Sequence, residues 1–190
     1  MRIAIDADQV LFDLVSPWHT LAENTLNRKL VEKNQRYNLM DRFGISREEY
    51  YRCWAAFNRW DLWKKCPVIP EALEAVNTWL KAGHEVFVIS AVDVDARRSR
   101  QKALDNLGLR QVRLMGVGFG GSKYYPLRIL EPDIFADDLW THCREAVDAG
   151  VPNVVRIAGG HDGGGDPVPG VSVLENIGEM LVKQRNCRVG

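Results

Sequence analysis

The chain begins with a short apolar run that ends in two carboxylates. In the N-terminal sequence MRIAIDADQV, Asp6 and Asp8 directly follow Ile3, Ala4 and Ile5. The apolar residues are typical of a buried strand. Side chains two residues apart on an extended chain lie on the same side, so both carboxylates can converge on one point. Two negative charges this close require a cation or a shared proton. In the simpler alternative, the strand ends in an acidic corner and Asp8 only caps a turn.

Further polar side chains follow later apolar segments. The segment EVFVIS ends in Ser90, and the segment PDIFADD ends in Asp137 and Asp138. Lys123 lies between these segments, in the turn-like sequence GGSKYYP. Because the carboxyl ends of parallel strands form the same edge of a sheet, we expect most of these side chains to share one site.

The order of an acid pair, a hydroxyl, a lysine and a second acid pair resembles the four motifs of the haloacid dehalogenase superfamily of phosphotransferases. The motifs span residues 6–138, which is most of the chain. The resemblance implies that Asp6 is a nucleophile that forms an aspartyl-phosphate, and that Asp8 is the general acid and base. It also implies that Ser90 binds the phosphoryl oxygens and that Lys123 neutralises their charge.

The same resemblance implies a magnesium ion held by Asp6, Asp8, Asp137 and Asp138. A carboxylate that attacks a phosphate monoester brings two anions together, so the reaction requires positive charge at the site. Oxygen atoms are the ligands that magnesium prefers. The sequence leaves open which of Asp137 and Asp138 contacts the metal directly.

Each of these residues also has a simpler structural explanation. Ser90 would start a turn at the end of a strand, and a lysine in a loop, such as Lys123, is usually a solvated charge. Asp137 and Asp138 would stabilise the N-terminus of the helix expected at residues 139–149. The order of all four motifs along the chain favours the catalytic interpretation.

Strand and helix patterns alternate along the chain. This alternation predicts an α/β fold with a three-layer, Rossmann-like parallel sheet that is covered on both faces. Active sites of such sheets lie at the carboxyl ends of the strands, where Asp6, Ser90 and Asp137 fall. Strands are expected at residues 3–5, 85–90, 112–115, 134–136 and 154–157.

Local signals predict where several helices begin. Ser16 and Pro17 are typical of a helix start, and Pro70 begins another helix. Asp95 is expected to cap a further helix. Asp13 lies near the first motif and is interpreted as a hinge or cap residue rather than a ligand.

Residues 14–66 interrupt the alternation of strands and helices. Within them, Ser46 and Glu49 form a capping box that predicts a helix. We expect these residues to be a small helical cap inserted after the first strand, with residues 1–13 and 67–190 forming the α/β core. Many members of the superfamily carry such a cap, which would exclude water and select the substrate.

The predicted cap is rich in aromatic residues. It contains nine of the 17 in the chain, too many for so small a unit to bury completely. Trp54 and Phe57 share a helical face, and Trp60 and Trp63 continue this spacing if the helix persists. We predict that these four residues, together with Ala91, form the substrate-binding group. Aromatic faces stack on nucleobases for about 1–3 kcal/mol per base. The alternative is that these rings only pack the cap.

The sequence WAAFNRWDLWKKCPVIPEALEAVNTWLKAGHEVFVIS resembles the corresponding stretch of the 5'(3')-deoxyribonucleotidases. The chain length and the later segment PGVSVLENIGEML also fit that family. The resemblance implies magnesium-dependent hydrolysis of nucleoside monophosphates, with a preference for deoxy and pyrimidine nucleotides. Two positions depart from the family pattern. Gln9 replaces the usual glycine after the second acid, and Ile89 stands where threonine often precedes the serine. Neither departure removes a charged catalytic group.

Composition is typical of a soluble enzyme. The 25 basic and 25 acidic side chains cancel, so no polyanion-binding surface and no stable nucleic-acid partner are expected. The N-terminus enters a strand at once and no apolar run reaches membrane-spanning length, which favours a cytoplasmic protein without a membrane partner. The oligomeric state stays open, and a homodimer is one alternative. The cysteines are expected to be reduced thiols: Cys53, Cys66, Cys143 and Cys187.

Two further segments could suggest a site. Residues 159–165 (GGHDGGG) lack the lysine and hydroxyl of a phosphate-binding loop, so we expect a flexible connection, with His161 binding no metal. A basic run follows Ser90 on a predicted helix and is expected to be mostly solvated, although Arg97 or Arg98 could reach a phosphate or a sugar. The run consists of Arg97, Arg98, Arg100 and Lys102.

Three functions remain open at the level of sequence. The leading one is a magnesium-dependent phosphomonoesterase that acts on a small phosphate ester, expected to be a nucleotide. The second is a phosphatase of the same fold that acts on another small ester, such as a phosphosugar, or on a polynucleotide 3' end. The absence of a basic stripe argues against the polynucleotide. The third is a non-catalytic binding protein, which would have no reason to keep the whole set of motifs.

Overall fold

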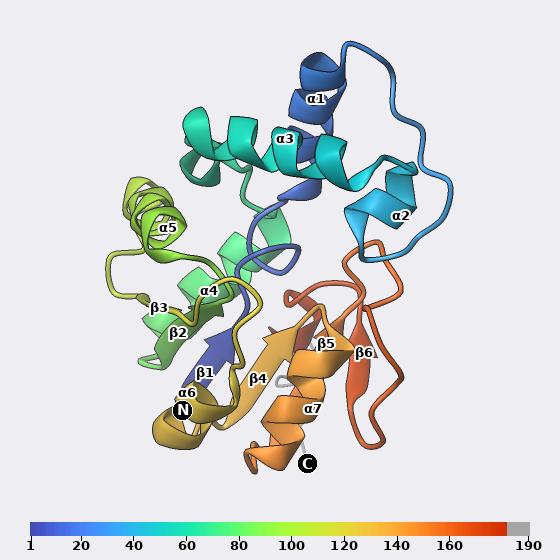
Figure 1. The fold of residues 1–190 in the computed structure, drawn as a ribbon. Helices are drawn as coiled ribbons and strands as arrows, with labels where there is room; N and C mark the ends of the chain where they lie inside the picture. The colour runs from blue at the N-terminus through green and yellow to red at the C-terminus, as the bar shows by residue number, and fades with distance from the viewer. Residues whose placement is uncertain (182–190) are drawn as a thin grey trace.

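The computed structural model describes residues 1–181. Its centre is a six-stranded parallel sheet with the strand order β3-β2-β1-β4-β5-β6 (Figure 1). This confirms the expected α/β fold, and β6 is a strand that the apolar patterns did not predict. The strands are β1 (Arg2–Ile5), β2 (Glu85–Ser90), β3 (Arg113–Gly116), β4 (Ile134–Asp137), β5 (Asn153–Ile157) and β6 (Ser172–Leu174).

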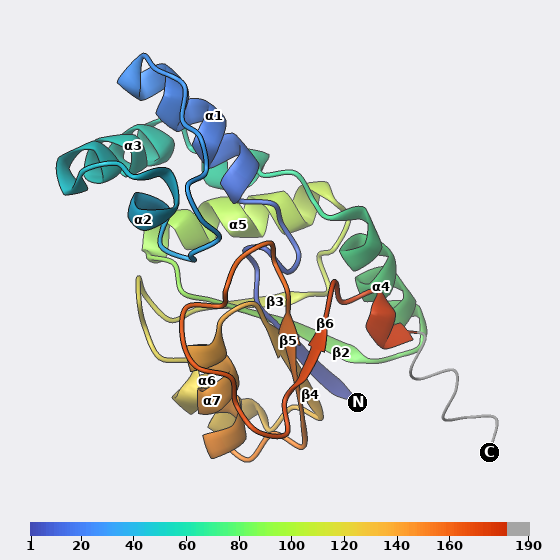
Figure 2. The same ribbon diagram turned by 90° about the vertical axis from the view of Figure 1, so that its right-hand side faces the viewer.

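Helices cover both faces of the sheet, as Figure 2 shows. The helices α4 (Pro70–Lys81) and α5 (Val94–Asn106) share one apolar cluster with β1 and β2. The helices α6 (Tyr124–Leu130) and α7 (Trp140–Asp148) contribute to a second cluster, with Phe87 and Phe135 from the sheet. Strands buried on both faces carry continuous apolar runs, as in the segment Val86–Ile89.

Residues 14–66 form four short helical elements above the carboxyl ends of the strands (Figure 1). They are α1 (Val15–Leu26), α2 (Leu39–Phe43), α3 (Arg47–Arg59) and the 3-10 helix η1 (Leu62–Lys65). The entry and exit of this region are hydrogen-bonded to each other, since Asp13 N–H donates to Pro67 O at 2.9 Å and Ile69 N–H donates to Leu11 O at 2.9 Å. This arrangement is compatible with the predicted cap, and the division into cap and core stays a prediction.

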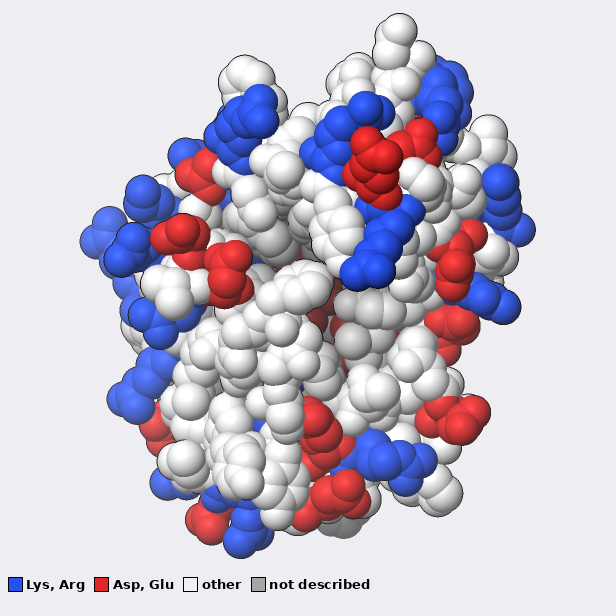
Figure 3. Space-filling view, viewed as in Figure 1, with Lys and Arg blue, Asp and Glu red and all other residues white. Residues whose placement is uncertain are grey.

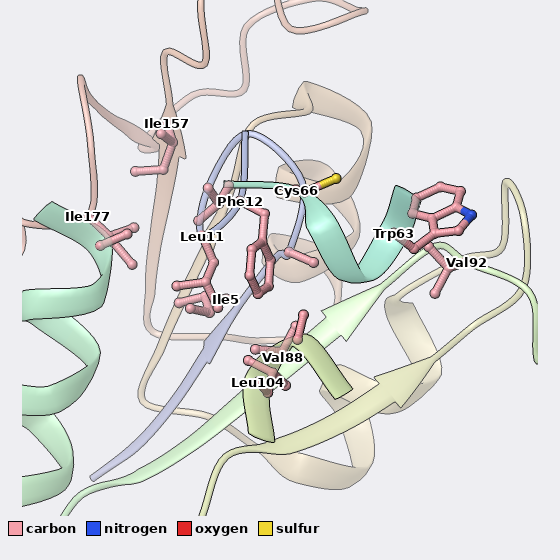
Figure 4. Packing of buried hydrophobic residues seen from close by; sticks show 14 of the residues in the cluster. Ile5, Leu11, Phe12, Trp63, Cys66, Val88, Val92, Leu104, Ile157 and Ile177 are labelled. Atoms are coloured by element: carbon pink, nitrogen blue, oxygen red, sulfur yellow. The ribbon is translucent and has the colours of Figure 1, made fainter. Parts of the chain in front are cut away.

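Apolar side chains of the entry and exit segments complete the core below the cap region. Figure 4 shows Leu11 and Phe12 beside Ile5 and Val88 of the sheet, with Cys66 of the exit segment next to them. All of these side chains are buried. Both connections are therefore anchored in the core, which fixes where the helices of residues 14–66 start and end.

The expected helix starts differ from the observed ones at two places. The capping box of Ser46 and Glu49 is present, and Pro70 begins α4, as predicted. However, α1 begins at Val15 without a side-chain cap, and the Asp13 carboxylate accepts the Ser16 amide at 3.0 Å. Helix α5 is capped by Asp93 rather than Asp95, because the Asp93 carboxylate accepts the Ala96 amide at 2.8 Å.

Three cysteines are free and buried, as expected for reduced thiols, namely Cys53, Cys66 and Cys143. Cys187 lies outside the described residues. Among residues 1–181, no helix is both long and apolar enough to cross a membrane.

Candidate active site

The central strands bring the two acidic motifs together. Because β1 and β4 are neighbours, Asp6 and Asp137 leave the same edge of the sheet, and Asp6 N–H donates to Ala136 O at 2.8 Å. Both carboxylates are buried. Lys123, at the start of α6, is fully buried between them; its Nζ donates to Asp137 Oδ2 at 2.7 Å and makes a short hydrogen bond to Asp6 Oδ1. The lysine is therefore part of the site, and the alternative of a solvated loop charge is excluded.

Three carboxylates of this site could hold a metal ion. Ligand oxygens of Asp6, Asp137 and Asp138 lie within 4.8 Å of one another. Lys123 provides one positive charge against these three acids, so the group keeps excess negative charge that a divalent cation would compensate. The donor set therefore fits a hard cation such as magnesium. Asp8 is not in this group, because its carboxylate is turned toward Arg100.

The pKa values of the three acids diverge. Burial raises the pKa of Asp6, against the opposing charge of Lys123, and Asp137 adds to the rise. Burial also raises the pKa of Asp138 well above its usual range, with further contributions from Asp137 and Asp6. Burial would raise the pKa of Asp137 as well, but Lys123 and His142 outweigh it and hold this pKa below its usual value. Asp138 is thus the acid whose charge the protein compensates least.

Two histidines contact the second acid pair, and the sequence did not identify either as a site residue. The His142 Nδ1 lies 3.3 Å from Asp137 Oδ1, which also accepts the Leu139 amide at 2.9 Å. The His161 Nε2 lies 2.8 Å from Asp138 Oδ2. Burial, together with the nearby Arg156 and Arg42, lowers the pKa of His161 to about 4, so its ring is neutral at physiological pH.

Arg100 contacts the other predicted catalytic acid. Its guanidinium is fully buried, pairs with Asp8 Oδ1 and donates from Nη1 to Trp63 O at 2.9 Å. The expectation of a solvated basic run is therefore wrong for Arg100. Arg100 shares one face of α5 with the buried Ala96 and Leu104. This spacing of four residues could have predicted that Arg100 is buried as well. The candidates for phosphate contact in the run, Arg97 and Arg98, are exposed and do not line the cavity described below.

Ser90 lies at the carboxyl end of β2 and is fully buried. Its hydroxyl has no hydrogen-bond partner among the described residues. Buried hydroxyl groups nearly always have a partner, so this unpaired one is unusual. Ser90 does not itself line the cavity described below, whereas the neighbouring Ala91 does. The unpaired hydroxyl is compatible with the predicted contact between Ser90 and a phosphoryl oxygen.

A cavity of about 170 Å³ lies between these polar groups and the helices of residues 14–66. Asp6, Asp8 and Asp138 line it. Figure 3 shows a hollow between the upper helices and the sheet, with acidic atoms at its bottom. Five aromatic side chains are part of its lining, and we call them the aromatic wall: Tyr37, Tyr50, Trp54, Trp63 and Phe119.

Not all of the residues predicted to bind the substrate reach this cavity. Trp54, Trp63 and Ala91 line it, and the two tryptophan rings are stacked at a centroid distance of 5.6 Å. Phe57 does not, because it is fully buried in the apolar core and packs edge-to-face on Trp63. Trp60 does not line it either and is 64% exposed. Helix α3 ends at Arg59, so Trp63 reaches the cavity from η1 and not from a continued helix.

Gln9 directly follows Asp8 and has an unusual backbone conformation. Its backbone is left-handed, with φ of 60°, a conformation that costs a non-glycine residue about 1–2 kcal/mol. The side-chain oxygen accepts the amides of Leu14 at 2.8 Å and Val15 at 3.2 Å. These bonds offset the strain and satisfy amides at the start of α1, next to the bond that the Asp13 carboxylate accepts from Ser16.

Comparison with known proteins supports the fold. No protein-family model matches the chain, and no curated protein matches it. Several solved structures, in contrast, are similar to the chain. A predicted phosphoglycolate phosphatase from Haemophilus somnus 129pt shares 12% identity with a TM-score of 0.67, over 96% of both chains. A HAD family hydrolase from Deinococcus radiodurans R1, with bound phosphate and sodium, shares 15% identity with a TM-score of 0.67, over 98% of this chain and 96% of that one.

The L-2-haloacid dehalogenase of Xanthobacter autotrophicus, which carries covalently bound chloropropionic acid, is also similar, with 12% identity and a TM-score of 0.57, over 97% of this chain and 98% of that one. The chain therefore has the fold of the haloacid dehalogenase-type hydrolases. Since these structures include both a phosphatase and a dehalogenase, the fold alone does not select the reaction.

Proposed function

We propose that this protein is a metal-dependent phosphomonoesterase that hydrolyses nucleoside monophosphates, with a preference for deoxyribonucleotides, through an aspartyl-phosphate. The observation that supports this most directly is the buried contact of Asp6 with Lys123, beside Asp137 and Asp138, at the bottom of the cavity. On this proposal, residues 14–66 are the cap that covers the cavity.

Asp6 is the nucleophile of the proposed reaction. One oxygen, Oδ1, contacts Lys123 and the other, Oδ2, accepts the Asp8 amide at 3.1 Å, so the carboxylate has a fixed orientation. In the first step an oxygen of Asp6 forms a bond to phosphorus while the ester P–O bond breaks, and the leaving alcohol takes a proton from Asp8. In the second step a water oxygen forms a bond to phosphorus while the bond between Asp6 and phosphorus breaks, and the water gives a proton to Asp8. Inorganic phosphate leaves and Asp6 is regenerated.

Positive charge must balance the phosphate during both steps. Lys123 supplies one charge, and the free hydroxyl of Ser90 can donate to a phosphoryl oxygen. Asp6, Asp137 and Asp138 would hold a divalent cation, which contributes further compensation of the negative charge when bound. The Asp8 carboxylate lies outside this group, so on this proposal it is not a side-chain ligand of the metal.

The aromatic wall supports a nucleotide as the substrate. The stacked rings of Trp54 and Trp63, with Tyr50 beside Trp54, offer flat apolar surfaces in the lining of the cavity. A base that stacks there would leave its phosphate pointing toward Asp6.

A second candidate substrate is a small phosphate ester with another acidic group, such as phosphoglycolate. Arg42 of α2 supports it, because this buried arginine lines the cavity and pairs with the more exposed Glu32 at 2.8 Å. The cavity volume of about 170 Å³, close to the roughly 150 Å³ that holds benzene in an engineered cavity, also favours a small molecule.

Turnover of a panel of phosphate monoesters by the purified protein tests both candidates. The panel contains 5' and 3' deoxyribonucleotides and ribonucleotides of each base, phosphosugars, phosphoglycolate and an aryl phosphate, each with magnesium and with a chelator. Asp6→Asn should lower turnover of the best substrate by several orders of magnitude, whereas the exposed control Asp166→Asn should not. Undiminished turnover by Asp6→Asn would overturn the covalent mechanism. Preference for phosphoglycolate over every nucleotide would favour the second candidate.

A further inference from the structure

The glycine-rich residues 159–165, which we call the glycine loop, are held in a defined conformation. Gly159, Gly160, Gly163 and Gly164 all have positive φ, which other residues adopt at a cost. The turn places His161 inward, where it is 7% exposed. The glycine loop therefore places a side chain next to the site, which the expectation of a connecting segment did not include.

Hydrogen bonds fix both the place and the tautomer of the His161 ring. The Gly163 amide donates to Nδ1 at 3.0 Å, so in the neutral ring Nε2 carries the proton and donates to Asp138 Oδ2 at 2.8 Å. Arg156 holds the same residue by its backbone, because Nη2 donates to His161 O at 2.6 Å. One acid of the candidate metal group is thus hydrogen-bonded to a ring that is itself held in place.

The next residue of the glycine loop binds the region of residues 14–66. The Asp162 amide donates to Gln35 O at 2.8 Å, and the Asp162 carboxylate accepts the Tyr37 amide at 3.0 Å. The Tyr37 ring lies 5.3 Å from the His161 ring and lines the cavity. A Cβ atom at Gly164 would lie 3.3 Å from Tyr37, so the segment and the loop are in close contact.

We propose that His161 is a positioning residue for Asp138, and that the glycine loop couples cation binding at Asp6, Asp137 and Asp138 to closure of the cavity by residues 35–37. The inference rests on the cation site of the proposed function and not on its substrate. A hydrogen bond that orients a ligating carboxylate commonly contributes about 10–100-fold to metal affinity. If the cation stabilises this orientation of Asp138 and His161, it also stabilises the adjoining contacts of Asp162, and the coupling is reciprocal.

Titration of the substrate-free protein with magnesium, followed by calorimetry, tests the positioning role. His161→Leu should weaken magnesium binding about 10–100-fold, and His161→Gln, which keeps an N–H donor, should weaken it less. His19→Leu is a matched control, since His19 lies in α1 and contacts Leu30 O. Thermal unfolding of each variant checks that it folds. Wild-type affinity in a folded His161→Leu variant, or no magnesium binding by the wild type, would overturn the proposal.

Hydrogen exchange of the Tyr37 amide tests the coupling. Magnesium should slow this exchange in the wild type, because the amide is bonded to Asp162. Asp162→Ala should speed the exchange and weaken magnesium binding, while leaving the His161 contact in place. Saturating magnesium should no longer protect the amide in Asp162→Ala, and equal protection in both proteins would contradict the coupling. A protein that passes these tests but hydrolyses no phosphate ester would refute the proposed function and leave this inference standing.

Discussion

The guanidinium of Arg100 connects the carboxylate of Asp8 to the exit of the predicted cap. It pairs with Asp8 Oδ1, donates to the backbone oxygen of Trp63, and lies 4.8 Å from the Phe12 ring and 5.2 Å from the Trp63 ring. Phe12 belongs to the entry of the cap region and Trp63 to its exit. Any displacement of these segments therefore changes the surroundings of the proposed acid–base residue.

We expect Arg100→Met to destabilise the protein by about 3 kcal/mol, because it leaves the Asp8 carboxylate largely buried without its partner. The double variant Arg100→Met/Asp8→Asn should recover part of this loss. Urea unfolding of the wild type, both single variants and the double variant measures the coupling. Strictly additive losses would mean that the two side chains do not stabilise each other.

Asp8→Asn tests the assignment of proton transfer to Asp8. The variant keeps the shape of the side chain but cannot donate a proton to the leaving oxygen or accept one from water. Its turnover should fall most for esters with poor leaving groups, such as alkyl phosphates, and least for an activated aryl phosphate. Rates across a series of leaving groups provide the measurement. A uniform loss across the series would rule out the acid role.

Alanine substitutions of the aromatic residues of α3 and of its C-terminal end should differ in whether they change substrate selectivity, stability or neither. Trp54→Ala should weaken turnover of the preferred nucleotide much more than that of an aryl phosphate, because Trp54 lines the cavity. Phe57→Ala should cost about 3–5 kcal/mol of stability without changing selectivity, since Phe57 is fully buried. Trp60→Ala, at an exposed site, should do neither. Steady-state kinetics and urea unfolding of all three variants check this, and unchanged selectivity in Trp54→Ala would remove the main support for a nucleotide.

The stability of the metal-free protein should depend on Asp138. Its pKa is raised in the folded state, so at a pH between the unfolded and the folded pKa the folded protein keeps a proton that the unfolded chain has released. The stability of the folded state therefore falls as the pH rises from the unfolded pKa to the folded one. Asp138→Asn should therefore raise the melting temperature in a chelator at neutral pH, and magnesium should no longer raise it further.

Asp137 provides the matched control for that experiment. Its pKa is lowered in the folded state, so its charge contributes stability that is present above the unfolded pKa and lost as the pH falls through the folded one. Asp137→Asn should accordingly lower the melting temperature at neutral pH. Calorimetry of both variants from about pH 4 to pH 8 checks that the two substitutions change the melting temperature in opposite directions. Equal effects of the two substitutions would contradict the electrostatic assignment.

Sequence alone predicted five of the six strands and the meeting of Asp6 with Asp137, because apolar runs of strand length report burial locally. Placing Asp6 and Asp137 at the ends of parallel strands was enough to expect them at one edge of the sheet. The capping box at Ser46 and the helix start at Pro70 are equally local and were also predicted correctly. Strand β6 was missed, since Ser172–Leu174 is too short to carry a pattern.

The tertiary structure decided the role of each residue whose partner is distant in the sequence. Arg100 looks like a solvated charge in the sequence, and only the order of the motifs, not its loop position, favoured a site role for Lys123. Both side chains are fully buried because Asp8, Asp6 and Asp137 come from other elements. The end of α3 at Arg59 allows Trp63 of η1 to stack on Trp54, whereas Trp60 is exposed. Local patterns fix which residues form strands and helices, whereas the burial, pairing and pKa of a side chain depend on charges and surfaces that only the folded chain brings next to it.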